Sequence, residues 1–278
     1  MTISALSRTL MSVARRGGRS IYALPEWAGF GNQLFFLLWG ALQQRNGLDY
    51  RIVRSERSES SLGAFPKLRD EVTISRDQVR FRDQRARALW DVMPGKFDRE
   101  NRDWFIGRYL MPSGFFDLAP GTADELTINI RRGDYYSDPD VRGRFSFDQI
   151  AYLNVILERL ADQRQDRRFS RIKVVSDDLE WCRTRLGFLQ DSCEELAWGS
   201  SGGPLDDLAT IAAARNLIIT NSTFSIWGAY ISNYLHDHRN DANVWAPAFG
   251  TRPFTGEPWE SLDPRWNIVK DIPGGWDS

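Results

Sequence analysis

The chain has 278 residues, of which 42% are hydrophobic, and its formal net charge at pH 7 is −1. This length leaves room for two domains of ordinary size, and the hydrophobic fraction is sufficient for a core in each. The near balance of charges argues against a nucleic-acid-binding protein that relies on bulk positive charge, so we expect no nucleic-acid partner.

The amino-terminal residues 1–20 are basic and carry no acidic side chain. We interpret them as a flexible tail, with contact to anionic lipid as the alternative. No apolar run reaches the about 18 residues that a membrane-spanning helix needs. Cys182 and Cys193 are too few for a disulfide framework and fit a reducing compartment. We therefore expect a cytoplasmic protein that at most rests on the inner face of a membrane.

A glycine turn joins the first predicted strand, residues 21–24, to a buried helix over residues 34–45. The turn reads Gly29-Phe-Gly-Asn-Gln33 and places Asn32 and Gln33 at the start of the helix. Free backbone N–H groups at this position favour an anion or sugar hydroxyls. The turn lacks the third glycine and the downstream acid of a dinucleotide-binding fingerprint.

The next stretch of the chain carries weaker patterns. Residues 50–53 are predicted as a second strand, and the polar residues 55–61 as a loop. Residues 76–87 are rich in arginine and alternate in charge, which favours the solvated side of a helix, with an acceptor-facing basic surface as the alternative. We place a domain boundary near Pro120-Gly121, where composition turns to proline and glycine.

A short buried strand over residues 127–130 is followed by Arg131, Arg132, Gly133 and Asp134. In open α/β sheets ligands bind at the carboxyl ends of strands, and the arginine fork matches phosphate oxygens. We interpret this stretch as a diphosphate clamp with Asp134 beside it, the alternative being a strand end with solvated charges. If the strand continued, the two arginines would point to opposite faces and at most one would face a ligand.

Two later strand ends are also polar. A strand over residues 171–175 ends at Ser176-Asp-Asp178, where one aspartate can cap the helix over residues 179–186 and the other stays free for ribose hydroxyls, guanine or an acceptor. A strand over residues 217–220 leads into Asn221-Ser-Thr-Phe-Ser225, whose donors could satisfy phosphate oxygens or simply cap the helix over residues 226–235.

Three other aspartate patterns have structural interpretations. Asp148 is predicted to cap a helix over residues 152–160, and Asp206 with Asp207 opens a helix over residues 208–214. Asp138-Pro-Asp140 has the Asp-x-Asp form of metal-dependent transferases, but we interpret it as a turn within a loop.

The order of the predicted elements indicates the fold class. A strand, a polar or glycine turn, and a helix follow one another four times along the chain. This order predicts a doubly wound α/β fold with a ligand crevice at the turns.

Four motifs together resemble those of the α-1,2-fucosyltransferase family of bacteria and animals, glycosyltransferase family 11. In chain order they are Gly29-Phe-Gly-Asn-Gln33, Ile130-Arg-Arg-Gly-Asp-Tyr135, Ser176-Asp-Asp178 with Glu180-Trp-Cys182, and Asn221-Ser-Thr-Phe-Ser225 with Trp227-Gly-Ala229. The resemblance runs from about Ile21 to Trp245.

The resemblance implies an α/β, GT-B-like fold of two Rossmann-like domains, with the donor site in the C-terminal domain and the cleft between them. Residues 21–121 would form the acceptor-side domain. Residues 122–278 would bind the GDP-sugar, with the C-terminal segment packing back. The implied reaction transfers L-fucose from GDP-β-L-fucose, with inversion and without metal or other cofactor, to O2 of a galactose-type sugar in a glycan acceptor.

Residue by residue, the resemblance assigns Arg131 to the donor β-phosphate and lets Arg132 and Asp134 support the same loop. Asp177 and Asp178 match paired aspartates near the donor or acceptor, and Asp207 matches an aspartate near guanine. The other implied donor-binding residues are Asn32, Gln33, Asn129, Ser176, Asn221, Ser222, Thr223, Phe224 and Ser225.

Two departures from the family pattern affect the mechanism. Asn129 stands where the family usually has histidine, and an amide takes no proton near neutral pH. Ile226 replaces the first tryptophan of a usual pair, which leaves the acceptor open. We expect Asp177 to be an orienting or proton-accepting group, with a base-free mechanism as the alternative. Two interpretations remain besides this one. The chain could be a transferase for another GDP-sugar or an unusual acceptor, or a non-catalytic nucleotide-sugar-binding protein of the same fold.

Overall fold

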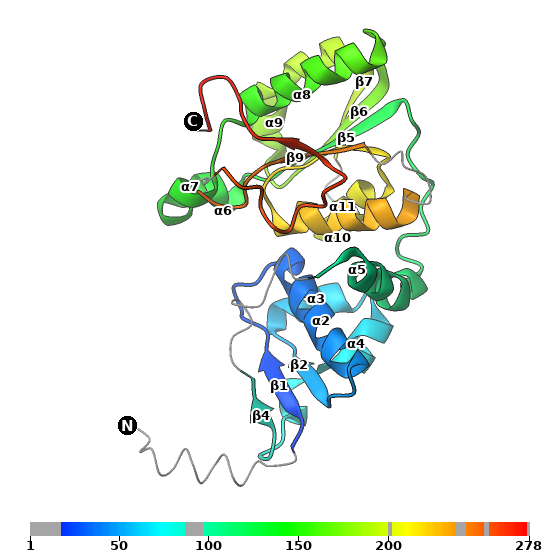
Figure 1. Cartoon of the computed structure of the whole chain (residues 1–278), viewed down its shortest axis with the longest axis vertical. Helices are drawn as coiled ribbons and strands as arrows, with labels where there is room; N and C mark the ends of the chain where they lie inside the picture. The colour runs from blue at the N-terminus through cyan, green and yellow to red at the C-terminus, as the bar shows by residue number, and fades with distance from the viewer. Residues whose placement is uncertain (1–17, 87–96, 200–201, 237–242, 253–255, 277–278) are drawn as a thin grey trace. The chain divides into compact units, whose positions relative to one another are not determined.

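The computed structural model describes residues 18–86, 97–199, 202–236, 243–252 and 256–276. The chain divides into two compact units, Met1–Phe115 and Phe116–Ser278, a division that falls shortly before Pro120-Gly121. Most of the expected amino-terminal tail lies outside the described residues. Figure 1 shows the elements of each unit in chain order.

The first unit is built on a parallel sheet with the strand order β3-β2-β1-β4. The strands are β1 (Ser20–Ala23), β2 (Tyr50–Val53), β3 (Thr73–Ile74) and β4 (Gln84–Arg85). The chain runs from β1 outward to β2 and β3, and then crosses back to add β4 on the other side of β1. The strand order therefore reverses between β1 and β4, which is the topological switch point of this sheet.

The helices of the first unit are α2 (Phe30–Arg45), α3 (Glu56–Leu62), α4 (Pro66–Val72) and α5 (Arg99–Phe105). The loop predicted over residues 55–61 is wrong, because α3 occupies it. Ser58 stabilises its first turn by accepting the Ser55 N–H at 3.0 Å and donating to the Ser55 carbonyl at 2.8 Å. The polar sequence concealed this helix because only Ser58 and Leu62 are buried.

The arginine-rich stretch also differs from its prediction. Instead of a long helix, it forms a single 3₁₀ turn, η1 (Arg76–Gln78), and then strand β4. Gln84 donates its backbone N–H to the Arg19 carbonyl at 2.9 Å, which adds this segment to the sheet. Charge alternation with a period of two suits a half-exposed strand as well as a helix surface.

The second unit has a parallel sheet with the strand order β10-β9-β8-β5-β6-β7. The strands are β5 (Glu125–Ile130), β6 (Phe169–Ser176), β7 (Cys193–Trp198), β8 (Asn216–Ile218), β9 (Asn243–Pro247) and β10 (Asn267–Val269). This is the strand order of a doubly wound dinucleotide-type sheet, and its switch point lies between β5 and β8. The predicted α/β class, with a parallel sheet in each unit, is confirmed.

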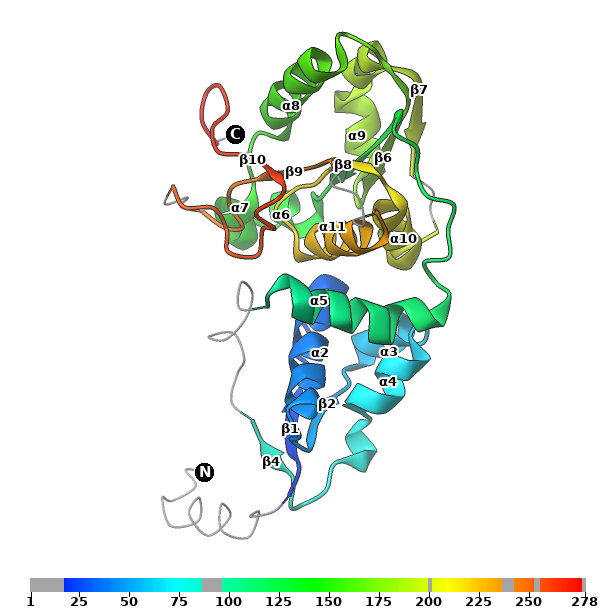
Figure 2. The ribbon, with the colours of Figure 1, turned by 45° about the vertical axis from the view of Figure 1, so that its right-hand side comes forward.

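Helices cover both faces of the second sheet, as Figures 1 and 2 show. α8 (Gln149–Arg164) and α9 (Leu179–Arg185) lie on one face, and α10 (Pro204–Ala213) and α11 (Thr223–His236) lie on the other. Ile128 and Ile130 of β5 share a core with Leu153 and Ile156 of α8. Because side chains alternate along a strand, Thr127 and Asn129 point to the opposite face.

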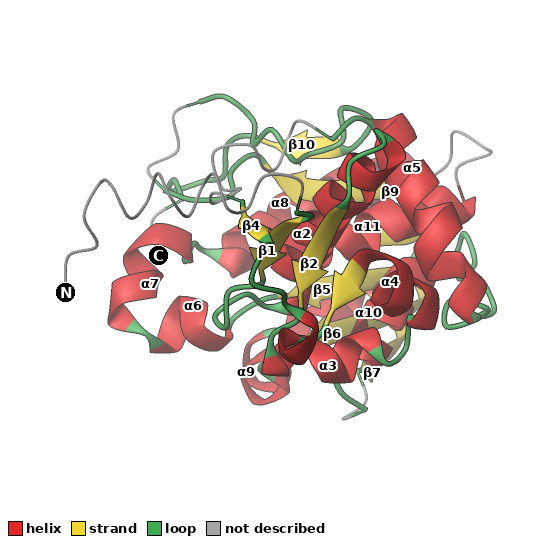
Figure 3. Cartoon of the chain, turned by 90° about the horizontal axis from the view of Figure 1, so that it is seen from below, coloured by secondary structure: helices red, strands yellow, loops and turns green. Residues whose placement is uncertain are grey.

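Short helices replace the loop that the sequence predicted after the arginines. α6 (Gly133–Ser137) and α7 (Pro139–Phe145) follow β5 directly and appear as successive helices in Figure 3. Asp138 caps α7 by accepting the Asp140 N–H at 2.9 Å. The sequence also missed β7, β9 and β10 as strands. None of the described helices is long and apolar enough to cross a bilayer.

Candidate active site in the second unit

The loop after β5 is tied to the loop after β8 at the switch point. The backbone N–H of Arg131 donates to the Thr220 hydroxyl at 3.0 Å, and Thr220 is fully buried. Three residues further on, Thr223 begins α11. The arginine loop and the amino end of a long helix are therefore held next to each other. The first N–H groups of such a helix carry partial positive charge and have no partner within the helix.

Arg131 projects its guanidinium into a cluster of carboxylates. Its Nη1 lies 2.7 Å from Asp177 Oδ2, and its Nη2 hydrogen-bonds Asp134. The cation also lies 5.1 Å from the centre of the Tyr135 ring. The side chain stays 35% exposed, so these contacts orient the fork without removing it from solvent.

Arg132 is held in a different environment, between two aromatic rings. Its guanidinium carbon lies 3.8 Å from the Tyr136 ring centre and 3.7 Å from that of Trp181. Nε is 3.5 Å from Asp178 Oδ2, and the side chain is only 13% exposed. Burial lowers the pKa of Arg132 from its ordinary value, but the group remains a cation at neutral pH. Arg132 thus has a supporting position, and Arg131 is the more exposed of the two.

Asp177 connects both arginines of the loop. Its Oδ1 accepts the backbone N–H of Arg132 at 2.8 Å, while Oδ2 pairs with the Arg131 guanidinium. Gly133 makes this approach possible, because a Cβ at that position would collide with Asp177 Oδ2. Gly133 also has a φ of +26°, a region that side-chain-bearing residues rarely adopt. Both carboxylate oxygens of Asp177 are engaged, which favours its orienting role over proton removal.

Asp178 is the helix cap of the pair. Its Oδ1 accepts the Trp181 N–H at 3.1 Å at the start of α9, and its own N–H donates to Ser176 Oγ at 3.0 Å. Ser176, the last residue of β6, is 8% exposed. Asp178 therefore positions both Trp181 and, through its Oδ2, Arg132.

The polar turn after β8 is mostly buried. Asn221 donates its amide to the carbonyls of Phe145 at 2.9 Å and Gly250 at 3.2 Å, which fixes the turn against α7 and the loop after β9. Its Oδ1 is buried and accepts no hydrogen bond from the residues that the structure describes. Ser222 Oγ accepts the Phe224 N–H at 3.3 Å. Thr223 and Phe224 are half-buried, and they are therefore more accessible to solvent than Asn221, Ser222 and Ser225, which are buried.

Asn129 lies inside the unit, although the sequence placed it at the donor. Its amide nitrogen donates to the Val175 carbonyl at 3.2 Å, and its oxygen accepts the hydroxyl of Ser225. Asn129 is 5% exposed and Ser225 is fully buried. A donor contact by either residue stays a prediction, and it would require this buried pair to separate.

Asp207 lies in the first turn of α10, half-buried and electrostatically coupled to Asp177. Burial is the largest cause that raises its pKa to about 6, and the neighbouring Asp206 adds to the effect while Lys173 opposes it. Because α10 follows β7, its first turn lies at the carboxyl ends of the parallel strands, the same edge of the sheet as the arginine loop after β5.

Asn32 and Gln33 belong to the first unit. Asn32 is half-buried in the first turn of α2, whereas Gln33 is 1% exposed and donates to the Ala28 carbonyl at 2.8 Å. The Gln33 oxygen is buried and accepts no hydrogen bond from the described part of the chain. Their proposed contact with a donor sugar stays a prediction.

Sequence reasoning missed two residues that hold the site together, Thr220 and Gln149. Gln149, the first residue of α8, donates its amide to the Arg131 carbonyl at 2.8 Å and accepts from Arg132 Nη1 at 3.4 Å. It is 2% exposed. The sequence offered its place directly after the predicted helix cap Asp148 as a signal, whereas its burial, which requires polar partners for the amide, appears only in the structure.

The site is suited to an anionic ligand with a leaving group that gains negative charge. It combines the fork of Arg131 with the amino end of α11, both fixed in place before a ligand binds. Burial raises the pKa of Tyr135 and of Tyr136 to about 12, so both phenols stay protonated and uncharged at neutral pH. Within the described ranges, no group of three or more histidine, cysteine, aspartate or glutamate side chains is arranged to hold a metal ion.

Comparison with known proteins agrees with this arrangement. Residues 115–236 match the family model described as Glycosyl transferase family 11, and this segment contains the arginine loop, the paired aspartates and the turn after β8. The matched segment is a little less than half of the chain, so the similarity to glycosyltransferase family 11 is shown for this part of the second unit. The resemblance that the motifs indicated is thereby confirmed, and the family match reaches the end of α11.

Individual relatives are similar over shorter stretches. The α-1,2-colitosyltransferase of Escherichia coli is 29% identical over 120 residues, which are 40% of this chain and 37% of that protein. Galactoside 2-α-L-fucosyltransferase Sec1 of Mus musculus is 31% identical over 106 residues, 38% of this chain and 28% of that protein. The matches thus span about a third of the length of these relatives.

A solved structure of Arabidopsis thaliana FUT1 in complex with GDP is also similar. It aligns with a TM-score of 0.41 and 9% identity, over 91% of this chain and 76% of that one. A likeness of this strength carries no weight for the function of this chain.

Proposed function

We propose that this chain belongs to glycosyltransferase family 11 and is an inverting glycosyltransferase that transfers L-fucose from GDP-β-L-fucose to O2 of a galactose-type sugar in a glycan acceptor. The observation that carries the proposal is the hydrogen bond from the Arg131 N–H to Thr220, which holds the arginine loop beside the amino end of α11. Cations and helix N–H groups that converge at a switch point form a site for a nucleotide diphosphate.

In this proposal Arg131 stabilises the leaving group. Cleavage of the bond between fucose and the diphosphate releases GDP, whose β-phosphate gains negative charge as the bond breaks. The Arg131 fork can donate two parallel hydrogen bonds to phosphate oxygens once it exchanges its bond to Asp134 or Asp177 for the ligand. Donors that are fixed before the reaction avoid reorganisation, and removal of one such donor typically costs about 3–4 kcal/mol in the barrier.

The other residues of the loop act through Arg131. Asp177 and Gln149 fix the backbone on either side of it, and Arg132 packs the loop against Trp181. We assign Asp207 to the guanine, because an ionised carboxylate accepts the N–H groups on the edge of that base. With Asp177 occupied by the arginines, the acceptor hydroxyl would lose its proton late, after the bond to GDP has largely broken.

A second candidate is a transferase for a different GDP-linked deoxy sugar. The similarity to an α-1,2-colitosyltransferase supports it. The arginine loop would bind both donors equally well, since it contacts the diphosphate, which they share, and other residues contact the sugar. A non-catalytic nucleotide-sugar-binding protein is the alternative from a different class.

A donor screen separates these candidates. Thermal shift with GDP-fucose, GDP-colitose, GDP-mannose, UDP-galactose and GDP identifies the nucleotide and the sugar, and GDP release with and without methyl β-galactoside shows whether transfer occurs. We expect GDP-fucose to give the largest shift and acceptor-dependent GDP release. Binding of GDP-sugars without release in the presence of acceptors would favour the non-catalytic alternative, and stabilisation by UDP-galactose alone would contradict the proposal.

A further inference from the structure

The first unit contains a pocket of about 470 Å³ that no motif of the family explains. It lies at the carboxyl ends of β1, β2 and β4, where Ala23, Val53 and Ala86 contribute to its lining. This position includes the switch point of the sheet between β1 and β4, the place where open α/β sheets bind ligands. The volume is in the range of about 300–1,000 Å³ that small-molecule sites occupy.

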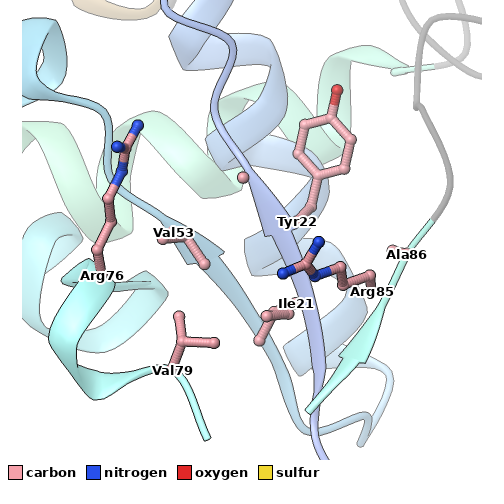
Figure 4. A pocket seen from close by; sticks show the side chains of 8 residues that line it. Ile21, Tyr22, Val53, Arg76, Val79, Arg85 and Ala86 are labelled. Carbon is pink, nitrogen blue, oxygen red and sulfur yellow. The ribbon is translucent and has the colours of Figure 1, made fainter. Parts of the chain in front are cut away.

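The floor of the pocket is apolar. Ile21, Val53 and Val79 line it and, together with Ile74, belong to one hydrophobic cluster. Tyr22 faces the other side of the sheet, where its ring stacks on Phe36 of α2 at 5.1 Å. Figure 4 shows Val79 and Ile21 between the two arginine side chains. An apolar floor of this kind can receive the C–H face of a sugar ring.

Two arginines flank this floor. Arg76 extends from η1 on one side, and Arg85 extends from β4 on the other with its guanidinium directed toward β1 (Figure 4). Arg76 forms an ion pair with Glu26, and both of these side chains are more than half exposed. Arg85 forms no ion pair within the part of the chain that the structure describes. The pocket therefore offers an uncompensated cation beside an apolar surface.

We propose that this pocket binds an acidic sugar residue of the acceptor glycan, one that carries a carboxylate or a phosphate. The sugar ring would lie on Ile21 and Val79, and its anionic group would pair with Arg85. A planar guanidinium matches carboxylate and phosphate oxygens with two parallel bonds. This inference rests on the proposed transferase function and narrows its acceptor class from galactose-type glycans in general to acidic ones.

Direct binding tests the proposal without requiring turnover. Calorimetric titration of the full chain would compare methyl β-D-galactopyranosiduronate, methyl β-D-galactopyranoside 6-phosphate and neutral methyl β-D-galactopyranoside. We expect at least one of the anionic sugars to bind about fivefold or more tightly than the neutral one, the size of one favourable exposed ion pair. The preference should shrink as salt rises, because exposed charges are screened.

Matched variants assign the effect to the pocket. Arg85→Gln keeps a polar side chain of similar length and should abolish the preference for the anionic sugar. Arg82→Gln removes another exposed charge from the same segment but not from the lining of the pocket, and should leave the preference intact. Arg76→Gln provides a second lining variant and should weaken the preference to a smaller extent, since Glu26 already shares that charge.

The outcomes distinguish this inference from the proposed function. Tighter binding of the galacturonide identifies a carboxylate as the anion, and tighter binding of the phosphate ester identifies a phosphate. Equal binding of all three sugars, or an anionic preference that survives Arg85→Gln, would overturn the inference. GDP titrated into the same preparations reports on the donor site. A chain that binds GDP but shows no anionic preference contradicts only the acidic acceptor, whereas a chain that binds no GDP contradicts the transferase itself.

Discussion

Replacement of Gly133 by alanine tests whether the arginine loop depends on the close approach of Asp177. An added Cβ would collide with Asp177 Oδ2 and lie 3.4 Å from Asp177 Cγ. The carboxylate has little freedom to move away, because Oδ1 accepts the Arg132 N–H at 2.8 Å and Oδ2 pairs with Arg131 at 2.7 Å. The substitution therefore forces the aspartate out of the position from which it holds the loop.

The magnitude follows from the interactions that would be lost. Hydrogen bonds to charged groups contribute about 1.5–3 kcal/mol each, and the partial exposure of Asp177 and Arg131 places these two bonds at or below the lower end of that range. A side chain at positive φ adds roughly 1 kcal/mol of strain. We expect Gly133→Ala to destabilise the second unit by about 3 kcal/mol, which corresponds to a fall in Tm of about 6–12 °C.

Chemical unfolding and GDP titration measure the two consequences. Gly143→Ala is the matched control, because Gly143 lies in α7 with negative φ and nothing within 4 Å of an added Cβ. It should be neutral or slightly stabilising, since alanine is favoured over glycine within a helix by roughly 0.5–1 kcal/mol. The reasoning is refuted if Gly133→Ala unfolds within about 0.5 kcal/mol of the wild type and binds GDP equally well.

Three further predictions concern the carboxylates. Asp177→Asn should lower transfer and weaken GDP binding together if Asp177 orients the loop, whereas a loss of transfer at unchanged GDP affinity would restore its role as a base. Because the fold raises the pKa of Asp207 to about 6, its contribution to stability is greatest at acid pH and is lost as pH rises through 6. Asp207→Asn should flatten that part of the stability profile, and GDP affinity of the wild type should fall by about tenfold between pH 7 and pH 5 if the ionised form binds guanine. If neither the stability nor the GDP affinity of the wild type changed with pH in this range, the raised pKa of Asp207 and its assignment to guanine would be contradicted. Activity should survive EDTA, and a full loss that manganese restores would instead implicate Asp138 and Asp140, or Asp177 and Asp178.

The sequence could predict which polar residues follow the ends of the strands and form the site. Ile130 and Ser176 are partners in the register of β5 and β6, so the residues that follow them must be neighbours. The proximity of Arg131 to Asp177 follows from that register and from the charges. The expectation that the arginines diverge to opposite faces assumed a continuing strand, but β5 ends at Ile130 and α6 begins at Gly133.

Contacts made by helix positions were not predictable in the same way. The environment of Asn129 depends on α11, which brings Ser225 onto the face of the sheet opposite α8. Gln149 reaches Arg131 and Arg132 only because α8 begins at that residue after its cap. Hydrophobic periodicity did not reveal helix α3, because only two of its side chains are buried and the pattern needs several buried positions to be visible.

The most direct test of the account is GDP release from GDP-fucose in the presence of a β-galactoside, compared between the wild type and Arg131→Ala. Loss of the fork that faces the developing phosphate charge should reduce turnover by about 100-fold or more, and Arg131→Lys should recover only part of it because a lysine cannot donate in parallel. Near-normal turnover in Arg131→Ala, in a chain whose unfolding is unchanged, would contradict the assignment of this loop to the donor diphosphate.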